Sequence, residues 1–395
     1  MKFTFNKQFM VLMFLLLNCF ASYAANENLI TKQITLKLTE AGTLPNKIAS
    51  SKKDLVTNLK IIGEINGTDL RFIREMAGSD VKGDSTSGNL SVLDLSEARF
   101  VAGGGYYYIR YYRYYTSNNI IGEYAFHGCS SLTSVIIPSS VTGIGEDAFS
   151  YCSSLTSINI PSSVTEIGRD AFYGCSSLTS INIPSSVTSI GEVAFGCCSS
   201  LTSVNIPSSV IEIEWRAFED CSSLTSVNIP SSVTEIESWT FGWCSSLTSV
   251  NIPSSVTYIG KGAFQDCISL TSVNIPSSVT EIEEDAFITC SGLRSIYVYA
   301  ETVPSTVAGA FEGCDSKNCT VYVPKGTYDA YWLSEWGYFD NIVEFDATNI
   351  RNMVVEPEAQ ESARYAVNGQ KLTAPVKGIN LVKYNNGRVK KEIVK

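Results

Sequence analysis

Twelve cysteines and a single histidine are the residues of this chain whose types could support chemistry. Eight of the cysteines recur at one constant step, at Cys129, Cys152, Cys175, Cys198, Cys221, Cys244, Cys267 and Cys290. A constant step indicates a repeat whose units stack, and parallel strands of stacked units lie about 4.8 Å apart. Equivalent side chains on such strands point in parallel directions, so two cysteines do not readily form the dihedral angle near 90° of a disulfide. We therefore predict free, buried thiols that pack as small apolar groups.

Three further cysteines of the expected mature chain lie outside this series. Cys314 and Cys319 are close enough in the sequence to bridge, and the sequence alone leaves open whether they form a disulfide or remain two thiols. Cys197 directly precedes Cys198 at a position outside the apolar pattern, which predicts an exposed thiol.

These residues do not form a pattern that is typical of an enzyme. His127 closely precedes Cys129. Within one unit of the repeat, which we call a coil, we expect the histidine to lie in a loop and the cysteine to lie in the core. The sequence has no C-x-x-C pair, no histidine cluster and no glycine-rich phosphate loop, which are common signals of metal and nucleotide sites. We predict a protein that is not an enzyme and that uses no metal or cofactor.

Acidic residues dominate the charge. The chain has 29 Lys and Arg against 39 Asp and Glu, a formal net charge of −10. Nucleic acid is therefore not an expected partner, because phosphate binding needs a clustered basic surface. One position of the repeat carries an acidic stripe, which we interpret as a solubilising surface with calcium binding as the alternative: Glu166, Glu212, Glu235 and Glu281.

Residues 1–24 have the features of a secretory signal peptide. Lys2 and Lys7 precede an apolar run from Phe9 to Phe20, and the segment ends in small residues at Ala24. The run is shorter than the roughly 20 residues that a bilayer span needs. We expect an exported protein without a transmembrane segment, located in the medium or at the outer cell surface.

The central part of the chain repeats with a fixed period. Leucines recur at the same step as the cysteines from Leu132 to Leu293, and prolines keep this step from Pro138 to Pro276. An L-x-x-L-x-L core at a period of about 20 to 29 residues is the signature of a leucine-rich repeat. The sequence predicts a repeat solenoid with short parallel β-strands on one face, mostly irregular return segments, a cap at each end and a small C-terminal β domain.

Changes in this pattern suggest the domain boundaries. Upstream, Ile61–Ile65 is a predicted strand, and Thr68-Asp69 is the expected cap of a helix through Met76. The chain divides into a signal peptide at 1–24, an N-terminal cap at 25–89, the solenoid at 90–323 with a tyrosine-rich insertion at 102–119, a C-terminal cap at 324–346, a linker at 347–363 and a β domain at 364–395. Aromatic residues of the C-terminal cap are expected to seal the open end of the core, namely Trp332, Trp336, Tyr338 and Phe339.

The irregular positions are the candidate binding residues. The insertion combines tyrosine with arginine, a composition favoured at binding surfaces, although its rings could equally pack over the first coil. Three tryptophans follow the second inward-facing isoleucine of their coils. The candidates are Tyr107, Tyr108, Arg110, Tyr111, Tyr112, Arg113, Tyr115, Trp215, Trp239 and Trp243.

The predicted strand face is uniform. It presents the same small polar residues in successive coils, with serine and asparagine alongside the threonines Thr156, Thr179, Thr202, Thr225, Thr248 and Thr271. Recognition of one protein normally needs varied anchors, whereas a uniform array suits a repetitive ligand. Glycan or polymer binding through this face, and a structural stalk, are therefore the alternatives to protein binding.

The repeat unit resembles the BspA-type leucine-rich repeats of bacterial surface proteins. The resemblance rests on the Ala-Phe-x-x-Cys-Ser-Ser-Leu-Thr-Ser-Val-x-Ile-Pro pattern and covers about residues 55 to 345, where residues 63–78 and 93–98 are similar to the opening of Gram-negative gut and oral members. It implies an adhesin or another host- or microbe-interaction protein with a protein or glycan ligand. The tail from Gly378 to Lys395 resembles the sorting domain of the type IX secretion route, which implies export to the outer surface.

Overall fold

The computed structural model describes residues 28–346 and, further along, 361–366, 371–372, 374, 377–384 and 389–394. The predicted signal peptide lies outside the described residues, as does most of the predicted linker. The chain divides into two compact units, residues 1–345 and 346–395. In the described part of the chain, no helix is long and apolar enough to cross a membrane.

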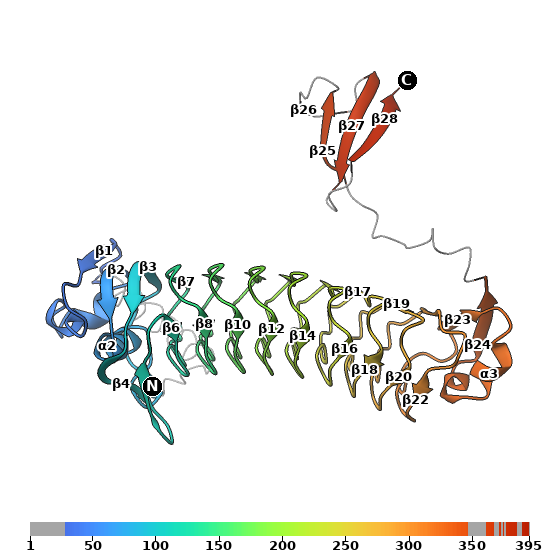
Figure 1. Ribbon diagram of the computed structural model, residues 1–395, viewed down its shortest axis with the longest axis horizontal. Coiled ribbons are helices and arrows are strands. Elements are labelled where there is room, and N and C mark those ends of the chain that lie inside the picture. Colours follow the sequence, from blue (N-terminus) through green and yellow to red (C-terminus); the bar gives the residue numbers. More distant parts are fainter. Residues whose placement is uncertain are drawn as a thin grey trace, which may run out of the picture. The chain divides into compact units, whose positions relative to one another are not determined.

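The first unit is a stack of coils whose longer strands form one parallel face (Figure 1). Equivalent residues of successive coils pair in register, as Ser180 does with Ser203 and Ser226 with Ser249. In chain order the strands of this face are β1 (Ile34–Lys37), β2 (Asn58–Ile65), β3 (Val92–Phe100), β7 (Ser134–Ile136), β9 (Ser157–Asn159), β11 (Ser180–Asn182), β13 (Ser203–Asn205), β15 (Ser226–Asn228), β17 (Ser249–Asn251), β19 (Ser272–Ile275), β21 (Ser295–Val298), β23 (Thr320–Pro324) and β24 (Asn341–Phe345).

The predicted solenoid is confirmed, and its return segments are more regular than expected. Each contributes a short strand to a second set of parallel ladders, and in the regular coils this strand follows the Pro-Ser-Ser-Val turn, after which the chain runs extended again. These strands are β6 (Ile120–Ile121), β8 (Gly143–Ile144), β10 (Glu166–Ile167), β12 (Ser189–Ile190), β14 (Glu212–Ile213), β16 (Glu235–Ile236), β18 (Tyr258–Ile259), β20 (Glu281–Ile282) and β22 (Ser305–Thr306).

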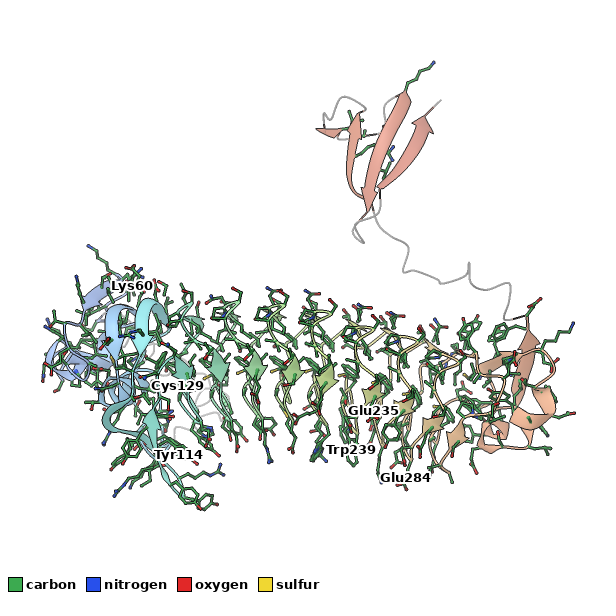
Figure 2. All side chains as sticks on the ribbon, viewed as in Figure 1. Lys60, Tyr114, Cys129, Glu235, Trp239 and Glu284 are labelled. Atoms are coloured by element: carbon green, nitrogen blue, oxygen red, sulfur yellow. The ribbon has the colours of Figure 1, made fainter. Side chains whose placement is uncertain are left out.

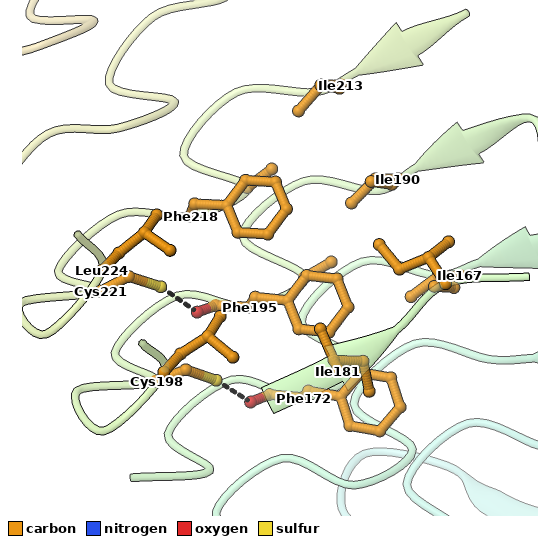
Figure 3. Close-up of a cluster of buried hydrophobic side chains, with 14 of the residues drawn as sticks. Ile167, Phe172, Ile181, Ile190, Phe195, Cys198, Ile213, Phe218, Cys221 and Leu224 are labelled. Carbon is orange, nitrogen blue, oxygen red and sulfur yellow. Dashed lines mark hydrogen bonds between the residues drawn. The ribbon is translucent and has the colours of Figure 1, made fainter. Parts of the chain in front are cut away.

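The core consists of ladders of identical side chains along the solenoid (Figure 3). Phenylalanine rings from Phe126 to Phe311 stack face to face, with centroid distances of 5.0–5.7 Å. Leucine, isoleucine and cysteine ladders surround them, and the eight repeat cysteines are buried free thiols, as predicted. Because a coil buries these rings only against its neighbours, stability depends on stacking.

Polar side chains of the repeat connect one coil to the one before it. Each ladder cysteine from Cys152 to Cys290 donates its Sγ–H to a phenylalanine carbonyl of the preceding coil, at 3.1–3.3 Å. Ser163 and its equivalents donate to a valine carbonyl at 2.5–2.7 Å. The phenylalanine carbonyls, which also accept a backbone N–H within their own coil, therefore gain a second hydrogen bond from the next coil, and the valine carbonyls gain a donor there.

The N-terminal coils carry the helix α2 (Gly67–Met76), after the 3-10 turns η1 (Leu44–Asn46) and η2 (Lys53–Leu55). The helix begins earlier than predicted, because Asn66 rather than Thr68 is its N-cap. The Asn66 side chain accepts from the Thr68 backbone N–H, and Asp69 accepts from the Asn66 N–H. This capping box fixes the start of the helix.

Between β23 and the last strand, β24, the C-terminal end carries α3 (Tyr328–Trp332) and η3 (Glu335–Tyr338). Trp336 and Phe339 are buried and pack against Phe311, the last ring of the phenylalanine stack. Trp332 and Tyr338 remain exposed. The expected aromatic seal therefore uses only two of the aromatic residues predicted to form it.

The second unit contains an antiparallel sheet in the order β26-β25-β27-β28. Its strands are β25 (Glu361–Ala366), β26 (Lys371–Leu372), β27 (Gly378–Tyr384) and β28 (Val389–Val394). β25 begins inside the segment predicted as linker.

Replacing Phe218 by alanine should lower the free energy of unfolding by about 3–5 kcal/mol, because its fully buried ring stacks on both neighbours. Chemical denaturation followed by circular dichroism measures the loss. Ile211, which is 62% exposed directly before β14 of the same coil, provides the control, since its replacement by alanine should change stability by less than about 0.5 kcal/mol. If Phe218→Ala lowers the free energy of unfolding as little as the control does, the stacked phenylalanine rings do not form the core of the solenoid.

Candidate functional site

The tyrosine-rich insertion is a β-hairpin and not a loop. β4 (Gly103–Ile109) pairs antiparallel with β5 (Arg113–Thr116), and Figure 1 shows the hairpin extending beyond the coils beside α2. The β-branched and aromatic residues around Tyr108 and Tyr114, which pair across the hairpin, favour this conformation. The insertion therefore presents its side chains from an ordered strand pair.

Two of the predicted binding tyrosines are anchors instead. Tyr107 and Tyr108 are only 1% and 3% exposed, so the prediction that they contact a ligand is wrong. The Tyr107 hydroxyl donates to the Glu123 carbonyl at 2.8 Å, and burial raises the pKa of that hydroxyl. The Tyr108 ring stacks on Tyr124 with a centroid distance of 4.9 Å. These two rings fix the base of the hairpin.

A buried arginine supports the same base. Arg74 at the end of α2 donates to the carbonyls of Tyr124 and Ala125 at 2.8 and 3.2 Å, and its guanidinium lies 4.8 Å from the centre of the Tyr108 ring. On the other side, the Gly105 N–H donates to Thr68 Oγ1 at 2.9 Å. Helix, hairpin and first regular coil are therefore held together by hydrogen bonds and ring stacking.

The remaining predicted residues of the hairpin are exposed. Tyr111, Tyr112 and Tyr115 are 83%, 75% and 51% accessible. Arg110 lies 5.7 Å from the centre of the Tyr111 ring, and Arg113 lies 5.2 Å from that of Tyr106. Neither Arg110 nor Arg113 forms an ion pair with any described residue. The hairpin tip therefore combines two large uncovered rings with two positive charges.

The predicted tryptophans lie at turns on one edge of the solenoid, where Figure 2 labels Trp239. The Arg216 guanidinium lies between two of them, 4.4 Å from the centre of the Trp215 ring and 4.9 Å from that of Trp239. Part of their surface is thus already used within the chain. Trp243 is the most open of the three, at 36% exposed.

These turns have a backbone feature that sequence reasoning missed. Trp239 and Trp243 have positive φ values of 54° and 59°, a left-handed conformation that costs most residues about 1–2 kcal/mol. The equivalent positions of other coils hold Gly262 and Gly174, also with positive φ. The alternation of glycine with larger residues at the repeat step was the signal that could have revealed these turns.

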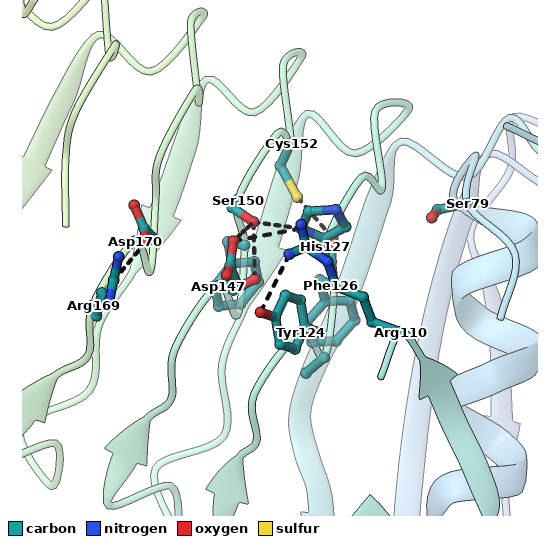
Figure 4. A network of polar contacts seen from close by, with 12 residues as sticks. Ser79, Arg110, Tyr124, Phe126, His127, Asp147, Ser150, Cys152, Arg169 and Asp170 are labelled. Carbon is teal, nitrogen blue, oxygen red and sulfur yellow. Dashed lines mark hydrogen bonds and ion pairs between the residues drawn. The ribbon is translucent and has the colours of Figure 1, made fainter. Parts of the chain in front are cut away.

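A polar network not foreseen from the sequence joins neighbouring coils (Figure 4). His127 Nδ1 lies 2.5 Å from Ser150 Oγ and 3.6 Å from Asp147 Oδ1. The Ser150 hydroxyl itself also contacts Asp147 Oδ1 at 2.5 Å and is fully buried. Histidine and serine occupy equivalent places in consecutive coils, one full repeat apart, which is why local spacing did not reveal them.

This network resembles a Ser-His-Asp site in residue types but not in geometry. A catalytic triad uses one imidazole nitrogen for the serine and the other for the carboxylate, whereas here the same Nδ1 faces both Ser150 and Asp147. Rings of Tyr108, Tyr124 and Tyr151 pack around the imidazole with centroid distances of 5.5–5.6 Å. The arrangement connects two coils, and its serine is buried rather than open to a substrate.

The model of the BspA type leucine rich repeat region matches this chain in six copies, over residues 119–245 and 213–329. Together these ranges run from residue 119 to residue 329, more than half of the 395 residues. The chain belongs to this family. No curated protein matches it.

Several solved structures are similar to this BspA-type chain. A leucine-rich repeat protein from T. pallidum is 38% identical, with 41% of this chain and 74% of that one covered and a TM-score of 0.38. A leucine-rich cell surface protein from Faecalibacterium prausnitzii is 26% identical over 60% and 85%, with a TM-score of 0.25. The pneumococcal vaccine antigen PcpA is 15% identical over 75% and 82%, with a TM-score of 0.38. The family assignment rests on the repeat model.

The cysteines of this BspA-type chain resolve the open disulfide question. Cys314 and Cys319 are both free and buried, so they do not form the disulfide considered above. Cys314 continues the cysteine ladder and donates to the Phe287 carbonyl at 3.2 Å, which directs its sulfur toward the preceding coil. Cys197, predicted to be exposed, is half-buried beside Tyr173, and burial raises the pKa of its thiol.

The acidic stripe is exposed, as a solubilising surface requires. Among the described residues, no group of three or more histidine, cysteine or acidic side chains is arranged to hold a metal ion.

Alkylation should separate the thiols by their burial. We expect iodoacetamide to label Cys197 first in the native protein. The rate of labelling should increase with pH, because only the thiolate reacts and the raised pKa of this thiol means that the thiolate forms at higher pH. After denaturation without reductant, Cys314 and Cys319 should both become labelled. Peptide mass mapping provides the readout, and protection of that pair until a reductant is added would reveal a disulfide instead.

Asp147 and Asp170 occupy equivalent turns, but their ionised carboxylates should have opposite effects on the stability of the fold. Although burial opposes it, hydrogen bonds from His127 and Ser150 hold the pKa of Asp147 below its usual value. Its ionised form therefore stabilises the fold at neutral pH, and this stabilisation is lost as pH falls below about 4. Asp147→Asn should lower the melting temperature at pH 7, with a difference that shrinks toward pH 3.

Asp170 supplies the matched comparison. Burial and the Asp147 charge raise its pKa, so its ionised form costs stability at neutral pH, and that cost disappears below about pH 4. Asp170→Asn should leave the melting temperature at pH 7 unchanged or raise it. Equal losses for the two variants at pH 7 would refute the assignment.

Proposed function

We propose that this BspA-type protein is a non-enzymatic binding protein, secreted or held at the outer cell surface, that recognises a protein on a host or microbial surface through the tip of hairpin β4–β5. The proposal rests on the difference in solvent exposure between tyrosines of one strand pair. Tyr107 and Tyr108 anchor the hairpin, while Tyr111 and Tyr112 extend into solvent.

Such an arrangement favours tight contact. Tyrosine rings provide large contact areas at little cost in side-chain entropy, and the ordered hairpin base spares part of the entropy otherwise lost on binding. Exposed rings of this size contribute nothing to the core of the solenoid. Their burial beneath a partner would be the favourable step.

Charge indicates which partner surface would fit. Arg110 and Arg113 have no ion-pair partner among the described residues, although the chain as a whole carries −10. A partner that presents carboxylates next to an apolar patch would match the two guanidiniums and the two rings. Such contacts steer association and weaken as salt increases.

The tryptophan edge is a second candidate contact. Trp243 is exposed and sits on a left-handed turn where another coil has Gly174, so its bulk is not required by the backbone. Non-glycine residues in such conformations are often retained for function. Cys197 and Thr289 occupy equivalent turns, however, so the backbone strain does not single out tryptophan.

Glycan binding through the threonine ladder has less support. Five threonines of the ladder donate their hydroxyl hydrogens to the threonine carbonyl of the preceding coil, at 3.0–3.5 Å: Thr156, Thr202, Thr225, Thr248 and Thr271. The ladder thereby stabilises the stack and retains only acceptor lone pairs for a ligand. The stalk alternative gives no reason for the uncovered hairpin rings.

Export belongs to the same proposal. The features of residues 1–24 support secretion, and the resemblance of the tail to a type IX sorting domain supports delivery to the outer surface. Loss of surface display after deletion of residues 364–395, measured by antibody labelling of intact cells, is the expected result.

Replacing Tyr111 and Tyr112 together by alanine should reduce binding at least about tenfold, because two large rings leave the contact. Immobilised matrix proteins, plasma proteins and mucins are the ligands to screen by surface plasmon resonance. For a ligand bound by the unchanged protein, raising sodium chloride from about 50 to about 500 mM should slow association.

Tyr151→Gly is the matched control. Tyr151 is another exposed tyrosine, at 52%, on a left-handed turn where the next coil has Gly174. It should fold and bind as the unchanged protein does. Undiminished binding by the Tyr111→Ala/Tyr112→Ala variant would reject the hairpin as the contact, and no binding to any ligand of the screen would reject the adhesin proposal.

A further inference from the structure

The outward row of the strand face changes character near its C-terminal end. Asparagines occupy this row in six consecutive coils and are exposed, at Asn159, Asn182, Asn205, Asn228, Asn251 and Asn274. In the next two coils the register places Tyr297 beside Asn274 and Tyr322 beside Tyr297. The last strand then places Val343 beside Tyr322. The row of amides therefore leads directly to a pair of aromatic rings.

The two rings form a ridge across the sheet. Tyr297 and Tyr322 stack with a centroid distance of 4.5 Å and an interplanar angle of 8°, so they lie one behind the other along the solenoid. Their neighbours in the row, Asn274 and Val343, have shorter side chains. Each ring is half-buried, and its shorter neighbour is too small to cover the whole of its outer face.

A third ring holds the ridge in place. Phe345 contacts Tyr297 edge to face at 6.3 Å and Tyr299 at 5.6 Å. The hydroxyls of Tyr297 and Tyr299 are protonated at neutral pH, as tyrosine hydroxyls ordinarily are, and can donate hydrogen bonds; burial raises their pKa further. The ridge is thus an ordered platform that combines ring faces with neutral donors.

Rings beside amides match the two surfaces of a sugar. The axial C–H groups of a pyranose carry partial positive charge and pack on the electron-rich face of an aromatic ring. Its equatorial hydroxyls pair with amide groups, which donate and accept at once. Asn251 Nδ2–H donates to Asn228 Oδ1 at 3.1 Å, which uses one donor and one acceptor of the row and leaves each amide further donor and acceptor capacity for a ligand.

The repeat distance also suits a polymer. Successive asparagines lie on strands spaced by about 4.8 Å, a distance close to the length of one hexose in an extended chain. A β-1,4-linked oligosaccharide lying along the row would therefore present one sugar to each amide and end against the ridge. The row and the ridge carry no charged side chain, and the net charge of −10 disfavours acidic polysaccharides.

We propose that the row Asn228–Asn251–Asn274 and the ridge of Tyr297 and Tyr322 form a binding site for a neutral, extended β-1,4-linked glycan that lies along the row, with the C–H edge of its terminal sugar against the uncovered face of Tyr297. This site differs from hairpin β4–β5 in residues and in ligand class, so it can be tested independently of the protein-binding proposal. It also differs from the threonine ladder, whose hydroxyl donors serve the fold.

The test uses the full mature protein with cellohexaose and mannohexaose as probes, and a heparin hexasaccharide as the charged comparison. Saturation-transfer NMR with irradiation of the aromatic protons should give signals from the sugar C–H groups of the neutral probes. Titration calorimetry should show that Tyr297→Ala and Tyr322→Ala each lower affinity at least about tenfold, while Tyr322→Phe, which keeps the ring, stays within about threefold. Asn274→Ala should weaken binding without disturbing the rings.

Tyr328→Ala is the matched control, because Tyr328 stacks on Trp332 at 6.1 Å in α3, outside the strand face, and is likewise partly exposed. This variant and Tyr111→Ala/Tyr112→Ala should bind cellohexaose or mannohexaose normally. The site is rejected if neither neutral probe binds, if only heparin binds, or if folded Asn274→Ala and Tyr297→Ala proteins keep full affinity.

Discussion

Satisfaction of buried backbone carbonyls by the next coil is the constraint on which this structure depends. A single coil with such short strands pairs only some of its own backbone groups, and burying an unpaired carbonyl is costly. Cysteine, serine and threonine each reach back to a carbonyl of the coil before, as Cys198 does to Phe172. The same polar residue types therefore recur at the same places for a structural reason.

This constraint also explains why the chain is so uniform on its strand face. A threonine that bonds to the carbonyl of its equivalent one coil earlier gives that carbonyl a second hydrogen bond beside the one from a backbone N–H, so its loss would weaken the contact between the two coils. Positions whose side chains extend into solvent can differ, and the exposed side chains of Tyr112 and Trp243 are of this kind. Within one repeat, the residues that hold the coils together stay the same, and the residues that differ between coils lie at other positions.

The fold was largely predictable from the sequence, because a fixed period with inward-facing residues such as Leu155 and Phe172 requires stacked coils. The candidate site was predictable only in part. The insertion was recognised, but which of its tyrosines face the core depends on how strand β4 packs against α2 and the first coil, as the burial of Tyr107 shows. His127 and Ser150 meet because coils stack, and Tyr297 meets Tyr322 for the same reason. Contacts between coils need the register, which the sequence of one unit does not contain.

The left-handed turns have a consequence for how such proteins diversify. Because Gly174, Cys197, Asp220 and Trp243 occupy the same turn in successive coils, the fold tolerates different side chains there, at a cost of about 1–2 kcal/mol for most residues other than glycine. Duplication of a unit therefore copies the structural residues of a coil together with one turn position whose side chain can change. Selection can then change the outer surface one coil at a time, and a new specificity can arise by recombining units rather than by remodelling a core.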